Sequence, residues 1–70
     1  MAELDVDALI SRFRERAEAV RERSLPPVAG EERRRLIEAA EIDFMDFSLV
    51  GAASWTVEGA DLVLRIPLSR

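Results

Sequence analysis

The chain has 70 residues and contains no Lys, His, Cys, Tyr, Asn or Gln. It therefore lacks most of the side chains that act as general bases, nucleophiles, soft metal ligands and amide readers of nucleic-acid sequence. Its formal net charge of -4 opposes non-specific binding to nucleic acid or anionic lipid. All ten basic residues are Arg, a usage typical of a high-GC bacterial genome.

The length predicts a single small domain over residues 1–70. A domain of this size buries only about 60% of the surface that its unfolded chain exposes. The absence of Cys and His excludes disulfides and Cys- or His-based zinc sites, which usually stabilise such small domains. A hydrophobic content of 49% with 34% charged residues is typical of globular proteins. We therefore expect a folded chain whose core is completed by oligomerisation.

Hydropathy predicts a protein without a membrane segment. The longest apolar run is residues 49–53, far short of the ~20 residues that cross a bilayer. The sequence begins Met-Ala-Glu-Leu-Asp, which is acidic where a secretory signal would be basic. We expect a cytoplasmic location and no membrane partner.

The first predicted element is a helix over residues 6–23. Its apolar residues recur at the i, i+3, i+4, i+7 spacing of one helix face. They are Val6, Leu9, Ile10, Phe13, Ala17 and Val20. Asp5 is a suitable N-cap, and Pro26 and Pro27 stop the helix because proline forces the residue before it out of the helical region.

A linker over residues 24–30 leads to a second predicted helix over residues 31–47. Glu31 and Glu32 place negative charge in its first turn, where the helix dipole favours it. An apolar face continues through Ile37, Ala40 and Phe44. Residues 42–50 fit helical spacing and also alternate as a strand would, so the sequence leaves their conformation open.

A β-hairpin is predicted over residues 53–68, around a type II′ turn at Gly59-Ala60. Pairing Glu58 with Asp61 fixes the register and puts one apolar face toward the core. That face contains Trp55, Val57, Leu62, Leu64, Ile66 and, at its end, Leu68. The predicted class is α+β, two helices followed by a C-terminal antiparallel hairpin.

Carboxylates are the strongest acid–base and metal-binding groups in the chain, but their spacing does not favour a site. Glu38 and Glu41 share one helix face, whereas Asp43 and Asp46 share another about 140° away. The serines have no His or Lys to activate them. We therefore expect no catalytic residue, no cofactor and no metal site in the isolated chain.

The arginines form two clusters, Arg12, Arg14 and Arg16 on the first helix and residues 33–35 on the second. Three consecutive helical residues fan over about 200°, so residues 33–35 do not form one basic stripe. Interleaved glutamates can pair with them, as Glu18 can with Arg14. This pattern disfavours a nucleic-acid partner.

The larger apolar residues of the second half are candidates either for the core or for a pocket on a partner, where Trp is enriched. The candidate partner-binding residues are Ile42, Phe44, Met45, Phe47, Leu49, Val50 and Trp55. Several of them lie off the best face of the second helix, and the open edges of a two-stranded sheet also invite pairing. Both observations indicate a second surface.

These features predict a non-catalytic small accessory or regulatory subunit that acts through protein–protein interaction. It would be self-associated or docked on a larger protein. The alternative is a small bacterial transcription regulator or an antitoxin. A regulator should carry a helix or ribbon of net positive charge, and the sequence shows none.

Overall fold

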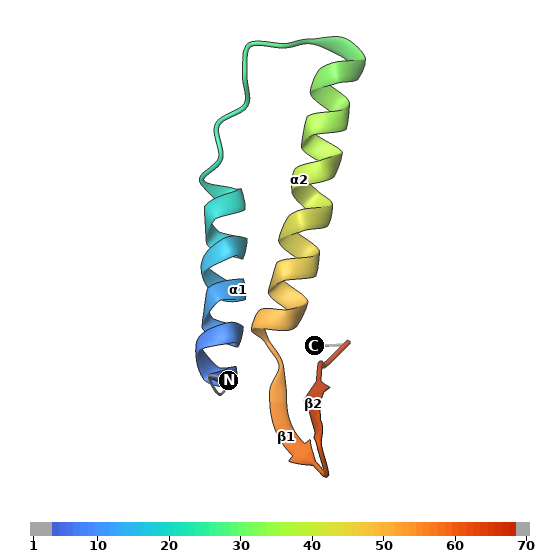
Figure 1. Cartoon of the computed structure of the whole chain (residues 1–70). Helices are drawn as coiled ribbons and strands as arrows, with labels where there is room; N and C mark the ends of the chain where they lie inside the picture. The colour runs from blue at the N-terminus through green and yellow to red at the C-terminus, as the bar shows by residue number, and fades with distance from the viewer. Residues whose placement is uncertain (1–3, 69–70) are drawn as a thin grey trace.

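The computed structural model describes residues 4–68, which form two helices followed by a two-stranded antiparallel sheet (Figure 1). Helix α1 spans Val6–Arg21 and helix α2 spans Gly30–Gly51. Strands β1, Ser54–Glu58, and β2, Asp61–Arg65, complete the chain. The predicted α+β class and order of elements are confirmed.

Helix α1 begins where the sequence predicts and ends two residues earlier. The Asp5 carboxylate accepts a hydrogen bond from the Ala8 amide at 3.0 Å, which caps the first turn. At the other end, the Glu22 amide donates to the Glu18 carbonyl at 3.1 Å and closes the last turn. The chain then leaves the helix toward Pro26 and runs extended along the upper part of α2 (Figure 1).

Helix α2 continues to Gly51, so its predicted end at Phe47 is wrong, and residues 42–50 are helical. A long-range contact stabilises the added turn: the Arg14 guanidinium Nε donates to the Gly51 carbonyl at 2.6 Å. That carbonyl belongs to the end of the helix, where no amide of the next turn can reach it and a positive charge is favourable. The periodicity of α2 alone could not reveal this partner.

The hairpin has the predicted register, with Glu58 paired to Asp61 and Trp55 paired to Leu64. Gly59 has a φ of 62°, and no residue other than glycine has a positive φ in the described chain. A positive φ at only the first central position distinguishes a type II′ turn from type I′. The hairpin is shorter than the predicted 53–68, because pairing stops at Ser54 and Arg65.

The core lies where the hairpin meets the first turns of α1. Val6, Ile10 and Ala53 are buried there. Three half-buried residues of the hairpin segment pack against them, Leu62, Leu64 and Ile66.

The predicted buried face of the hairpin is therefore only half correct. Trp55 is 40% exposed, Val57 is 58% exposed and Leu68 is 87% exposed. Val6 and Ile10 are the buried residues that the first two turns of α1 offer, and this contact is too narrow to cover both strands.

The molecule is extended and thin, with principal dimensions of 50 × 30 × 16 Å. Its radius of gyration is 15.7 Å, whereas a compact domain of this length has about 11 Å. Its accessible surface is 5768 Å², compared with about 4,400 Å² for a compact monomer of the same mass. A layer of this thickness leaves the side of α2 that faces away from α1 without a covering element (Figure 1).

Candidate protein-interaction surface

The candidate partner-binding residues lie in separate places on the structure. Phe44 and Phe47 are half-buried on the side of α2 that packs on α1. Ile42 and Met45 are exposed on another side of the same helix, and Trp55 lies on β1. The structure therefore divides a set that the sequence treated as one group.

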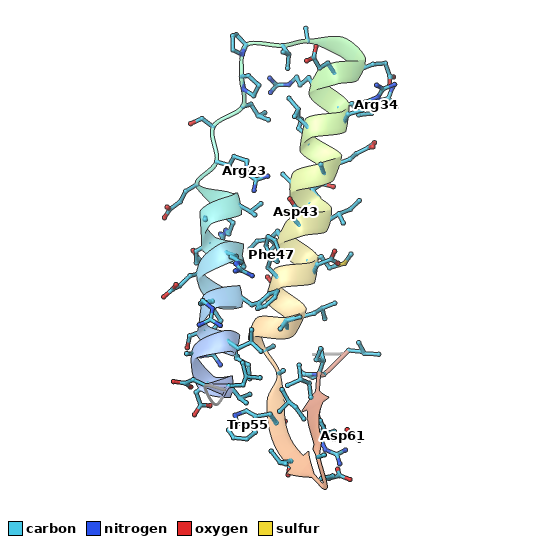
Figure 2. The ribbon with its side chains drawn as sticks, viewed as in Figure 1. Arg23, Arg34, Asp43, Phe47, Trp55 and Asp61 are labelled. Carbon is cyan, nitrogen blue, oxygen red and sulfur yellow. The ribbon has the colours of Figure 1, made fainter. Side chains whose placement is uncertain are left out.

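Phe44 and Phe47 connect the two helices. The Phe47 ring points toward α1 and meets the Phe13 ring edge to face, with centroids 5.9 Å apart and planes at 62° (Figure 2). The Arg21 guanidinium lies 5.5 Å from the centroid of the Phe44 ring, within reach of a cation–π interaction. Both phenylalanines thus stabilise the chain's own fold.

A second set of residues forms a continuous apolar line on α2, which we call the outer stripe: Ile42, Met45 and Leu49. At 100° per residue, these positions lie about 100 to 160° around the helix from Phe44. Ile42 is 54% exposed and Met45 is 55% exposed, while Leu49 is half-buried. The outer stripe is therefore directed away from α1. Val50 is half-buried in the last turn and lies outside this stripe.

The segment after β2 extends the outer stripe. Pro67 and Leu68 share with Met45 and Leu49 the lining of a shallow cavity of about 240 Å³. Leu68 is the most exposed large apolar side chain of the described residues. The apolar surface thus continues from α2 onto the C-terminal segment.

Trp55 projects from β1 toward the first turn of α1 (Figure 2), where its indole Nε1 donates to the Asp7 carboxylate at 2.9 Å. A cavity of about 510 Å³ lies beside it, lined by polar groups that include Asp7, Ser11, Arg14 and Ser54. Asp7 is held by the indole, and Arg14 is held by the Gly51 carbonyl. Neither serine has a base to activate it, so this cavity contains no nucleophile–base pair.

A third surface, which sequence reasoning missed, is a groove between α1, the linker and α2. It encloses about 530 Å³, and we call it the linker groove. Its lining residues are Val20, Arg21, Leu25, Ile37, Ala40, Glu41 and Phe44. The sequence signal was Leu25, an apolar residue placed between the end of a helix and two prolines. Near this groove, the guanidinium of Arg23, just after α1, lies 3.5 Å from the carboxylate of Asp43 on α2 (Figure 2).

The arginine contacts agree with the sequence prediction only in part: glutamates pair with Arg21 and Arg34 at i, i+3 spacing, but not with Arg14. The expected pairing of Arg14 with Glu18 is wrong: Glu18 lies 3.9 Å from Arg21, and Arg14 binds the Gly51 carbonyl. Arg16 lies 4.9 Å from the centroid of the Phe13 ring, and Arg34 pairs with Glu31. Much of the basic charge is thus engaged in contacts within the chain, which the sequence pattern could not assign one by one.

The acidic residues of α2 are spread along the helix. Within residues 4–68, no three acidic side chains lie close enough together to hold a metal ion. Asp43 instead faces Arg23. Neither helix combines the length and the hydropathy needed to span a bilayer, as far as residues 4–68 show.

Comparisons with protein-family models, with curated proteins and with solved structures find no match to this chain. Its function is therefore inferred from the surfaces themselves. Three of these surfaces carry exposed apolar side chains and few side chains that could act as nucleophiles or bases. They are the outer stripe, the linker groove and the exposed side of β1.

Proposed function

We propose that this protein is a small accessory or regulatory subunit that works in the cytoplasm by protein–protein contact and not by catalysis. One observation carries the proposal: the chain exposes about 1,400 Å² more surface than a compact monomer of its mass. A standard interface removes about 800 Å² from each partner. The excess is large enough for one such interface.

The composition of the exposed surface supports the same function. Ile42, Met45 and Val57 are each more than half exposed. Soluble monomers rarely expose large contiguous apolar patches, and such patches mark interaction sites. The small buried core adds to this argument, because no side chain of the described residues is completely buried. Association would supply the burial that the single chain lacks.

The chemistry of the cavities supports a role in binding. The charged side chains beside Trp55 are already engaged in intramolecular hydrogen bonds. The linker groove is lined mostly by apolar groups, with Arg21 and Glu41 as its charged residues. Such a groove suits an apolar side chain of a partner protein better than a reacting substrate.

Light scattering and unfolding together test the proposal. Purified protein at micromolar concentration should have at least twice the 7.9 kDa chain mass, or should be a monomer that unfolds without cooperativity until a partner is added. A monomer with cooperative unfolding would contradict the proposal, because such a chain needs no partner to complete its fold.

The alternative, a transcription regulator, is tested by DNA binding. Our proposal expects duplex DNA affinity at the non-specific level, unchanged when the arginines at 33 to 35 are replaced by serine. A regulator would bind at sub-micromolar concentration in about 150 mM salt, with the logarithm of affinity falling by about 0.9 per neutralised phosphate for each tenfold rise in salt. That result, lost in the serine variant, would favour the regulator.

A further inference from the structure

We infer that the outer stripe is a homodimer seam, along which α2 pairs antiparallel with α2 of a second copy. The two-fold axis would pass between Ile42 and Met45, so that each Ile42 packs beside the partner's Met45. This inference rests on the proposed function, since it names the partner of one of the surfaces described above.

The spacing of the stripe fits helix pairing. Ile42, Met45 and Leu49 follow the i, i+3, i+7 pattern that places apolar residues along the contact line of two helices. Ala52, exposed at the end of α2, continues the same line. These positions face away from α1, so a second helix can approach without displacing the first.

The exposed surface is large enough for a second copy to bind. A stable interface needs about 800 Å² from each partner, and the chain exposes about 1,400 Å² more than a compact monomer. A two-fold pair covers the same stripe on both chains at once. Leu68, beside the stripe and 87% exposed, would gain cover from the same contact.

The charges beside the stripe select the antiparallel orientation. In a parallel pair, Glu41 of one chain would face Asp46 of the other on both sides of the seam, and Glu38 would meet its own copy. Like charges in such positions destabilise the pair.

The antiparallel register removes these conflicts. Glu41 then lies beside the partner's Ser48, and Asp46 lies beside the partner's Ala39. Glu38 lies beside the partner's Leu49, where its methylene groups can cover an apolar side chain. The dipoles of the two helices also oppose each other, which is the favourable arrangement.

Light scattering on matched variants tests where the chains meet. Met45→Glu places a charge in the seam while keeping a residue that favours helix. Val57→Glu places the same charge on β1, at a residue of similar exposure, 58% against 55%. We expect the wild-type protein and Val57→Glu to have twice the 7.9 kDa chain mass, and Met45→Glu to fall toward the single-chain mass at equal concentration.

Spin labelling tests the orientation without disturbing the seam. The chain has no native cysteine, so Arg34→Cys gives one attachment point per chain, at an exposed position. With 1.5 Å of rise per residue, the antiparallel pair separates the two labelled backbones by about 28 Å along the axis. A parallel pair would bring them to about 10 Å, the usual distance between packed helices.

Each outcome decides between the alternatives. A dimer that Val57→Glu dissociates and Met45→Glu does not would overturn the seam while leaving the accessory-subunit proposal intact. A wild-type monomer without cooperative unfolding would do the same, because it indicates a different protein as partner. A label distance near 10 Å would overturn the antiparallel pairing, and a cooperative wild-type monomer would overturn both proposals.

Discussion

Gly51 lies at a close approach between the two helices. It is the one buried residue of α2 in the described chain, and a β-carbon added there would lie 2.8 Å from Arg14 Cγ and 3.2 Å from the Arg14 amide nitrogen. A contact of 2.8 Å does not occur between relaxed carbon atoms, a contact of 3.2 Å is tighter than most, and the nitrogen belongs to the backbone of α1. A side chain at position 51 would therefore push the helices apart.

We predict that Gly51→Ala lowers the free energy of unfolding by about 1 to 3 kcal/mol, the usual cost of overpacking. In an ordinary helix the same change stabilises by about 1 kcal/mol, so the sign of the effect is informative. Urea unfolding followed by circular dichroism measures it. Ala39→Gly, at an exposed position of α2, serves as control for helix propensity alone. A gain in stability for Gly51→Ala would mean that the close approach is absent.

The sequence could not have predicted this contact. Arg14 and Gly51 are 37 positions apart, and neither residue type indicates that the other is its partner. Local spacing offered Glu18 as a partner for Arg14, but a helix-surface ion pair contributes only a few tenths of a kcal/mol. A hydrogen bond from a charged donor to a half-buried helix carbonyl contributes about 1.5 to 3 kcal/mol, which explains why the long-range partner wins.

Among the secondary-structure elements, the start of α1 and the turn of the hairpin could be predicted from neighbouring residues alone. Asp5 caps α1 and Gly59 forms the hairpin turn as the sequence indicates, because each acts on atoms within a few residues of itself. The end of α2 was not predictable in this way. Residues 48–51 stay helical through a contact with α1, and periodicity within α2 contains no information about that contact.

The hairpin gives a test at two adjacent positions. Trp55 is 40% exposed, so we expect Trp55→Ala to cost about 2 kcal/mol, roughly half the value for a fully buried aromatic side chain. Thr56 faces the other side of β1 and is exposed, so Thr56→Ala should cost less than about 0.5 kcal/mol. Trp55→Phe keeps an aromatic ring but removes the bond to Asp7 together with part of the ring surface, so its cost should fall below that of Trp55→Ala. Equal costs at 55 and 56 in denaturant unfolding would contradict the register.

At the scale of the whole molecule, sequence length and the absence of Cys predict a small core that the single chain does not complete. The structure is thin and extended, with a shortest dimension of 16 Å. The same reasoning could not sort the candidate partner-binding residues. Phe44 and Met45 are neighbours in sequence, yet one packs toward α1 and the other is exposed. Only the position of α1 around α2 separates them, and that position depends on long-range contacts.

We predict that the midpoint temperature of unfolding rises with protein concentration. If the folded state is an associated one, mass action stabilises it as concentration increases, whereas the unfolded chain does not associate. Calorimetry over a hundredfold range of concentration measures the shift, and Met45→Glu should reduce it. A midpoint that stays constant over that range would indicate that association contributes nothing to stability.

The position of the core has a consequence for how the chain is made. Val6 and Ile10 are covered by Leu62, Leu64 and Ile66, which are among the last residues that the structure describes. A ribosome adds residues at about 5 to 20 per second, so α1 is synthesised several seconds before these partners exist. The first turns of α1 therefore have no partners to cover them until the rest of the chain has been translated. Folding of the hairpin end is completed only after the second strand has left the ribosome.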